Sequence, residues 1–308
     1  SESITADDMK KHLTVIAGDS FEGRETGEPG NDKAAEYIAD HFKNIGIKPI
    51  NSIDEGYFQP VAFNFESWNN AEIFVNGQRY RHLWDFLAFQ DYNETADSVE
   101  IDKILFMGYG IDDPNYSDYK WKWVKNRSIM IYEGEPVDEN GNSRITGSST
   151  KSEWSSDIEK KLKVAMDKGV NTVFIISDDI KKKLSENRRA LLGAKVTLGD
   201  LGDRPKYPNS VYISTTIAKE IMGDKLNKVI ASRDRIVEKG KLRKVRLRPD
   251  VLLDLDKKTS SIKGRNVLGY IEGSDKKEEL VVMSAHYDHL GKRGESIYNG
   301  ADDNGSGT

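Results

Sequence analysis

Apolar positions along this chain repeat with two different periods, which predict a mixed α/β protein. Behind the N-cap signal Thr5-Ala6-Asp7-Asp8, apolar side chains recur every three or four residues and predict a first helix that ends near Gly18. A second stripe of the same period, from Ala34 to Ile45, predicts another helix closed by Gly46. The segment between them is rich in Gly and Pro and is interpreted as an irregular surface loop.

Period-2 alternation and short apolar runs predict several strands in the middle of the chain. Aromatic and polar residues alternate from Tyr57 to Tyr80, and Asn76-Gly77 inside this stretch is a strong hairpin signal. A strand, helix and strand order follows, with a last strand and helix further on, at residues 103–111, 128–132, 157–168, 170–176 and 211–222. This order predicts a small α/β unit within the chain.

The C-terminal stretch combines an apolar run with polar residues that can carry chemistry. The run from Leu280 to Ala285 is too short for a helix and predicts a strand covered on both faces, which would pair with the strand predicted at Asn266–Gly273. The turn Gly300–Gly307 is expected to open a helix. An imidazole and a carboxylate would then lie just past a buried strand, where open α/β sheets usually bind ligands.

Composition narrows the classes of protein that fit. The 308 residues include 46 basic and 51 acidic ones, a net charge of −5 that argues against a nucleic-acid partner. No apolar run approaches the roughly 18 residues needed to cross a bilayer. Because there are no cysteines, a disulfide framework and a Cys-ligated zinc are both excluded. Ser stands at position 1, as in a processed protein, so a secreted or periplasmic location is expected.

The region Lys225–Arg248 is densely basic and allows two interpretations. A patch for nucleic acid or membrane is the sharper one. An exposed strand with solvated charges is the other, because Val245 and Leu247 alternate with basic residues. No aromatic residues interleave with the charges, which favours the exposed strand.

Candidate metal-binding chemistry lies in two short motifs, His286-Tyr287-Asp288 and Asp302-Asp303. A neutral imidazole and a carboxylate are ligands suited to zinc. Asp288 is placed to accept a hydrogen bond from the second ring nitrogen of His286, and one Asp of the pair could bridge two metal ions. Spacing alone leaves open which Asp does so. Each motif by itself is also ordinary turn material, but the combination favours a metal site.

The segment from Ser284 to Gly291 and the turn from Asn299 to Gly307 resemble the first half of the metal site of the co-catalytic zinc aminopeptidases. That family also includes glutamate carboxypeptidase II and the transferrin receptor. The resemblance implies that His286 binds one zinc, that Asp288 serves in catalysis by orienting it, and that Asp303 bridges both zinc ions. His289 has no ligand role in the pattern and is interpreted as a loop side chain.

The resemblance extends over most of the chain. It includes an F-x-G-R-x-x-G loop between the first two helices, an I-G-I-K-P turn after the second, an F-x-G-Y-G-I turn, an Asp-Tyr pair, and N-V-x-G-x-I-x-G before the His motif, at residues 21–27, 45–49, 106–111, 118–119 and 266–273. It implies a mainly parallel peptidase sheet flanked by helices and interrupted by a smaller α/β protease-associated domain. The expected boundaries are 1–90 and 246–308 for the peptidase domain and 91–245 for the insertion.

The function implied is that of a zinc-dependent exopeptidase acting on peptides, foremost an aminopeptidase, with two zinc ions in the complete protein. A non-catalytic binding relative and a carboxypeptidase of the same fold are the alternatives. The family's Glu-Glu pair, its further Asp or Glu and its distal His would all follow Thr308, so the chain is expected to be a fragment that is inactive alone. The histidines His12, His41 and His82 show no partner spacing that could replace them.

Overall fold

The computed structural model describes residues 4–50, 56–120, 123–199 and 205–308, which form two compact units. Unit 1 takes its residues from 1–65, 196–201 and 260–308, and unit 2 takes its residues from 66–195 and 202–259. The unit bounds therefore differ in position from the domain boundaries at 90/91 and 245/246. The assignment of the two units to a peptidase and a protease-associated domain stays a prediction.

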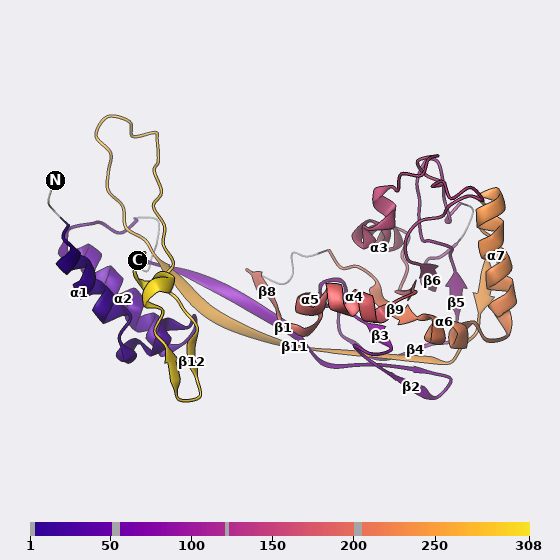
Figure 1. The fold of residues 1–308 in the computed structure, drawn as a ribbon, viewed down its shortest axis with the longest axis horizontal. Coiled ribbons are helices and arrows are strands. Elements are labelled where there is room, and N and C mark those ends of the chain that lie inside the picture. The colour runs from indigo at the N-terminus through magenta and orange to yellow at the C-terminus, as the bar shows by residue number, and fades with distance from the viewer. Residues whose placement is uncertain (1–3, 51–55, 121–122, 200–204) are drawn as a thin grey trace. The chain divides into compact units, whose positions relative to one another are not determined.

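The α/β class is confirmed by the elements of the structure (Figure 1). The helices are α1 (Ala6–Ile16), α2 (Pro29–Asn44), α3 (Ile158–Asp167), α4 (Ile180–Glu186), α5 (Arg188–Leu192), α6 (Thr215–Met222) and α7 (Leu226–Lys239). The strands are β1 (Phe58–Val75), β2 (Gln78–Arg81), β3 (Phe86–Leu87), β4 (Ala96–Ile101), β5 (Ile104–Phe106), β6 (Ser128–Tyr132), β7 (Thr172–Ser177), β8 (Lys195–Leu198), β9 (Asn209–Ser214), β10 (Val245–Leu247), β11 (Val251–Val267), β12 (Gly291–Arg293) and β13 (Ser296–Tyr298). Strands β1 and β11 contribute residues to both units.

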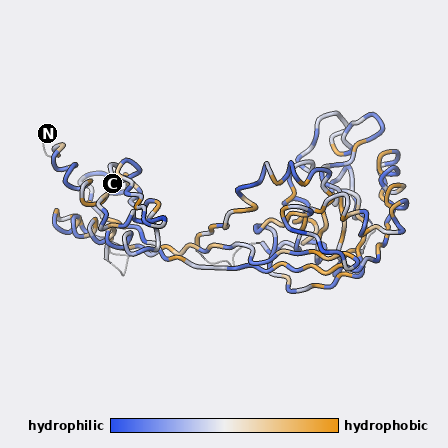
Figure 2. Tube along the Cα trace, turned by 60° about the horizontal axis from the view of Figure 1, so that its bottom comes forward, coloured by the Kyte–Doolittle hydropathy of each residue, from blue (hydrophilic) through white to orange (hydrophobic). Residues whose placement is uncertain are grey.

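Unit 2 is organised around a sheet with the order β10-β5-β6-β7-β9-β3, in which β5, β6, β7 and β9 run parallel. Because side chains alternate between the two faces of a strand, Val173 and Ile175 of β7 join one hydrophobic cluster, and Phe174 and Ile176 join another. Helices α3, α4 and α5 cover the first face, and α6 and α7 cover the second. Hydrophobic residues accordingly recur along the elements of this unit (Figure 2).

The predicted elements of the middle of the chain are confirmed, with one correction. The hairpin at Asn76-Gly77 joins β1 to β2 in the register Val75↔Gln78. The basic region is an alternating strand only at β10, and residues 226–239 form helix α7. Its buried residues, Val229, Ser232 and Ile236, lie three and four positions apart, a helical period that the charges between them conceal.

A buried carboxylate shapes the F-x-G-Y-G-I turn of unit 2. Asp118 is fully buried and accepts hydrogen bonds from the backbone N–H of Tyr109, at 2.9 Å, and from the hydroxyl of Tyr116, at 2.6 Å. A Cβ on Gly108 would lie 2.3 Å from Asp118 Oδ1, so the turn needs glycine at this position. The motif therefore marks a turn in which the backbone folds closely around the carboxylate of Asp118.

Unit 1 is built around helices α1 and α2 and contains few buried apolar side chains. Thr5 caps α1 and forms a reciprocal capping box with Asp8, as predicted. The loop between the helices is not the surface loop that was expected. It contains the 3-10 helix Asp19–Arg24, and Gly23 and Arg24 are buried.

The prediction of a strand at Leu280–Ala285 is wrong. This segment is an irregular loop, and the side chains of Leu280 to Met283 are 75–93% exposed (Figure 1). The strand predicted at Asn266–Gly273 ends at Val267, and only a single bridge, Lys48↔Tyr270, follows it. A strand requires a hydrogen-bonded neighbour, and Leu280–Ala285 pairs with none of the described residues.

Two further predictions assumed that strand: a parallel sheet in the peptidase domain and a helix after Gly300. The parallel strands β5, β6, β7 and β9 lie in unit 2, whereas unit 1 contains parts of β1, β8 and β11, the bridge above and the antiparallel β12–β13 hairpin. The helix expected after Gly300 is a single wide turn at Ala301–Gly305, with non-helical backbone angles at Asp303 and Asn304. Among the helices of the described ranges, none is long and apolar enough to cross a bilayer.

The His82 side chain gives unit 2 a testable dependence on pH. The ring packs against Phe86, and its Nε2 accepts a hydrogen bond from the N–H of Ala88 at 3.1 Å. Burial lowers the pKa of His82 from 6.5 to about 4. Between pH 6.5 and 4, His82 therefore binds a proton in the unfolded chain but not in the folded unit. This contribution of His82 to stability is present above pH 6.5 and is lost as the pH falls towards 4.

We expect the unfolding free energy of the wild-type protein to fall by up to about 3 kcal/mol more than that of His82→Gln between pH 7 and pH 4. Gln keeps an oxygen acceptor for Ala88 but does not titrate. Urea unfolding of both proteins at a series of pH values measures the difference. Parallel curves for the two proteins would contradict the assignment.

Candidate metal centre

The three predicted site residues lie in unit 1 on two segments that flank a short hairpin. His286 and Asp288 precede strand β12, and Asp303 follows strand β13. The antiparallel register Gly291↔Tyr298 folds the chain back on itself, so the two segments come side by side. The wide turn at Ala301–Gly305 then directs the Asp303 carboxylate towards His286.

The imidazole of His286 faces a different carboxylate with each of its nitrogens. Nδ1 lies 3.1 Å from Oδ1 of Asp288, and Nε2 lies 3.3 Å from Oδ1 of Asp303. When Nδ1 carries the hydrogen and donates it to Asp288, the lone pair of Nε2 is directed to the side of Asp303. This is the tautomer in which a histidine binds a metal through Nε2 while a carboxylate orients it.

The spacing of His286 and Asp303 fits two ligands of one zinc ion. Ligand bonds of about 2.0–2.2 Å in a tetrahedral site separate an imidazole nitrogen from a carboxylate oxygen by about 3.4 Å. The observed separation is 3.3 Å. Among the residues that the structure describes, no group of three or more His, Cys, Asp or Glu is arranged to hold a metal ion. These segments therefore bring together two candidate ligands, whereas a zinc site needs three or four.

The segment that carries His286 is anchored on both sides. Thr26 Oγ1 donates a hydrogen bond to Oδ2 of Asp288 at 3.1 Å, so both carboxylate oxygens of Asp288 have a partner. The hydroxyl of Tyr287 donates to the backbone carbonyl of Arg265 at 2.5 Å, and burial raises the pKa of Tyr287 to about 12. Sequence reasoning did not single out Thr26, although it lies inside the F-x-G-R-x-x-G loop.

Arg24, in the same loop, is the second residue that sequence reasoning missed. Its side chain is completely buried and donates hydrogen bonds to four backbone carbonyls at 2.6–2.8 Å, those of Ile16, Tyr287, Asn299 and Gly300. The R of the loop motif is the signal in the sequence, but nothing in the motif tells which groups it binds. The structure places it between the His motif and the Asp turn.

His289 is more than a loop side chain. Only 15% of it is exposed, and its Nδ1 lies 3.9 Å from Oδ2 of Asp303. It packs against Gly300, which has a left-handed φ of +55°, and a Cβ at Gly300 would lie 2.4 Å from the Cγ of His289. The glycine before the Asp pair is thus required by both conformation and space.

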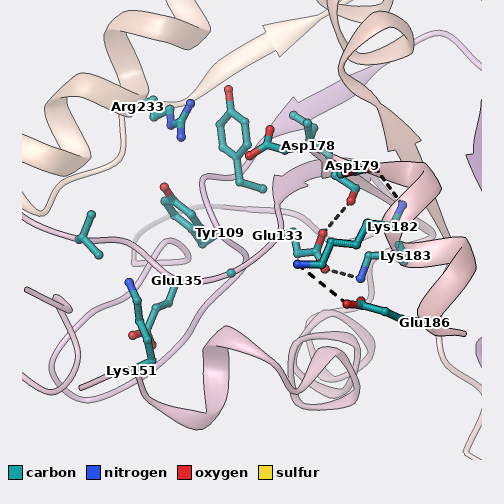
Figure 3. Close-up of a pocket in the computed structure, with 15 residues that line it drawn as sticks. Tyr109, Glu133, Glu135, Lys151, Asp178, Asp179, Lys182, Lys183, Glu186 and Arg233 are labelled. Atoms are coloured by element: carbon teal, nitrogen blue, oxygen red, sulfur yellow. Dashed lines mark hydrogen bonds and ion pairs between the residues drawn. The ribbon is translucent and has the colours of Figure 1, made fainter. Parts of the chain in front are cut away.

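A cavity of about 440 Å³ lies in unit 2, where the chain leaves β6 and β7 (Figure 3). Two pairs of opposite charge lie in its wall, since Lys183 pairs with Glu133, and Lys182 lies 3.9 Å from Glu186. On another wall, the guanidinium of Arg233 lies 4.6 Å from the centre of the Tyr132 ring. The cavity is therefore assigned no ligand.

Comparison with known protein families gives a match for the C-terminal segment. Residues 266–308 match the model of Peptidase family M28. This match covers His286, Asp288 and Asp303, so the resemblance to the co-catalytic zinc peptidases is confirmed for this segment. No curated protein matches the chain.

Solved structures of two aminopeptidases are similar to the chain at low identity. The aminopeptidase from Aneurinibacillus sp. strain AM-1 is 16% identical over 98% of this chain, with a TM-score of 0.43. BSAP, a zinc aminopeptidase from Bacillus subtilis, is 15% identical over 100% of this chain, with a TM-score of 0.32. The chain spans 56% of the length of each of these two proteins.

The packing of Gly300 against His289 can be tested with a matched pair of glycines. Gly294 has a similar φ of +60° but nothing within 4 Å of an added Cβ. Gly294→Ala should cost about 1–2 kcal/mol of unfolding free energy, from the left-handed backbone alone. Gly300→Ala should cost a further 1–3 kcal/mol or so, because its Cβ would lie 2.4 Å from Cγ of His289 and 2.5 Å from the backbone oxygen of Asp303, so both must move. Equal losses in chemical denaturation would show that the contact with His289 is not tight.

Proposed function

We propose that this chain belongs to a zinc-dependent exopeptidase that acts as an aminopeptidase on peptide substrates. The observation that carries the proposal is the His286 ring, which faces Asp288 with one nitrogen and Asp303 with the other. The sequence that forms this arrangement lies inside the segment that matches Peptidase family M28. A lone histidine on a loop requires neither carboxylate, so the double pairing supports a metal site over a structural turn.

Each residue has a distinct role in the proposed site. His286 would hold zinc through Nε2, and Asp303 would hold it through its carboxylate and would be shared with a second zinc ion. Asp288 accepts the hydrogen of Nδ1, which fixes the ring orientation and makes Nε2 a stronger donor. Thr26 holds the Asp288 carboxylate in this position. Zinc, when bound, supplies Lewis acidity towards the peptide carbonyl and an activated water.

The proposed site also has a suitable position on the molecule. His286 and Asp303 are exposed, so a peptide can reach them, whereas Arg24 and His289 behind them are mostly or fully buried. Donor atoms at the surface that are supported by a packed layer underneath are what a metal site for a diffusible substrate requires. The aminopeptidase assignment over a carboxypeptidase rests on the resemblance predicted from the sequence.

Substitutions in the complete gene product test the metal assignment. We expect His286→Ala and Asp303→Ala to abolish tight zinc binding and peptide cleavage, because each removes a ligand. Asp288→Asn should keep the fold and weaken zinc binding or activity by roughly 10- to 100-fold. His41→Ala is the matched control, since His41 contacts His12 on the helices and not the site. Zinc content by mass spectrometry and a peptide cleavage assay measure both effects.

The same assay separates the alternatives through the choice of substrate. An aminopeptidase cleaves a peptide with a free N-terminus and an amidated C-terminus, but not one whose N-terminus is acetylated. A carboxypeptidase shows the reverse preference. Zinc binding without cleavage of either peptide would favour a non-catalytic relative, and wild-type zinc content and turnover in His286→Ala would refute the metal assignment altogether.

A further inference from the structure

We propose that Arg24 is a positioning residue that sets the separation between His286 and Asp303. The inference rests on the proposed function for its purpose, but it is a statement about this chain's own geometry. Arg24 touches neither a ligand atom nor, in the proposed reaction, the substrate. It acts through the two backbone segments from which the imidazole and the carboxylate project.

The guanidinium of Arg24 joins these two segments directly. Nε donates at 2.7 Å to the carbonyl of Tyr287, the residue next to His286. Nη1 donates to Asn299 at 2.7 Å and Nη2 to Gly300 at 2.8 Å, on the segment that leads into Asp303. Because the guanidinium is planar and its donors are fixed relative to one another, a bond on each side fixes the distance between the segments.

Two additional contacts hold Arg24 itself in place. Nη1 also donates to the carbonyl of Ile16 at 2.6 Å, in the last turn of helix α1, where the partial negative charge of the helix end favours a cation. The backbone carbonyl of Arg24 accepts hydrogen bonds from the N–H of His289 and from Asn31 Nδ2, both at 3.1 Å. The residue is thus bound through its side chain and its main chain to the same C-terminal segment.

Burial makes this arrangement rigid and hard to replace. None of the Arg24 surface is exposed, and its φ of +53° follows a φ of +71° at Gly23 in a turn that folds under the site. Burial lowers the pKa of Arg24, while the charge of Asp288 opposes that shift, and an arginine remains a cation under either influence. Asp288, the carboxylate that orients His286, thereby also helps to keep the Arg24 cation in place.

Other bonds between the two segments lie on the outside of the site. Asn304 Nδ2 and Thr308 Oγ1 donate to the carbonyl of His286 at 3.3 and 3.0 Å, both in exposed positions. Water competes more for such bonds than for those of Arg24, whose side chain is fully buried and whose bonds are at least partly buried. The buried guanidinium is therefore the contact that keeps Nε2 of His286 and the Asp303 carboxylate at the spacing of two zinc ligands.

Variants of Arg24 and a matched arginine test the proposal. Arg24→Met keeps the volume but removes all donors, and Arg24→Lys keeps the charge but not the planar fork. Arg293→Met is the control, because Arg293 is more than half exposed and binds Glu25, the neighbour of Arg24, on the outer side. Two readouts are used: hydrogen exchange of the metal-free 308-residue chain, and zinc affinity of the complete gene product.

We expect both Arg24 variants to raise amide exchange at least tenfold at residues 287–289 and 299–305, with helix α2 unchanged. Zinc affinity should fall by roughly 10- to 100-fold, as it does when an outer-shell partner is lost. Arg293→Met should leave both readouts at their wild-type values. A folded Arg24 variant with wild-type exchange and wild-type zinc affinity would overturn the proposal.

If neither Arg24 variant folds, hydrogen exchange of the wild-type chain tests the proposal. The N–H of His289 lies in an irregular segment, so slow exchange there supports the bond to the Arg24 carbonyl, and exchange at the rate of an unstructured peptide overturns the proposal. A wild-type protein that binds no zinc and cleaves no peptide would refute the proposed function alone. The exchange pattern of the metal-free chain would still decide the role of Arg24.

Discussion

The interaction on which unit 1 depends is the set of hydrogen bonds between one buried guanidinium and four backbone carbonyls. Few apolar side chains are buried there, mainly Ile16 and three alanines of helix α2, so hydrophobic burial leaves much of the geometry undetermined. Arg24 provides what the small apolar core does not, because its donors have fixed directions and burial makes the loss of any of them costly. The position of the candidate metal centre follows from this polar centre.

Unit 2 combines the same device with an ordinary hydrophobic core. Its sheet buries apolar residues on both faces, which determines the order and the direction of the strands. At one turn, however, the buried carboxylate of Asp118 collects backbone N–H groups, as the guanidinium of Arg24 collects carbonyls. In both places a glycine with positive φ allows a close approach, of Gly108 to the Asp118 carboxylate and of Gly23 to the backbone oxygens of Gly291 and Tyr298. The two glycine-containing motifs of the sequence thus mark buried ions as much as turns.

The sequence was sufficient wherever a local pattern determines the outcome. Helices α1, α2 and α3, the Asn76-Gly77 hairpin and the parallel strands β5, β6, β7 and β9 follow from period and turn chemistry, and the structure brings His286, Asp288 and Asp303 together. The sequence was insufficient wherever the partner of a side chain lies far away in the sequence or is a backbone group. Four apolar residues from Leu280 show a preference for burial but not what would cover them, and the carbonyls that Arg24 binds leave no mark in the sequence. Likewise, no spacing revealed that His12 and His41 pack 4.6 Å apart.

The composition of unit 1 from both ends of the described chain has a consequence for the order of folding. The partners of Arg24 on the Asp turn lie 275 and 276 residues further along the chain. At a synthesis rate of about 5–20 residues per second, Arg24 is synthesised roughly 14–55 s before those carbonyls are made. Unit 2, whose residues lie between them, is synthesised and can fold in that interval. Unit 1 is then completed after unit 2, and helices α1 and α2 must remain available until residues 260–308 reach them.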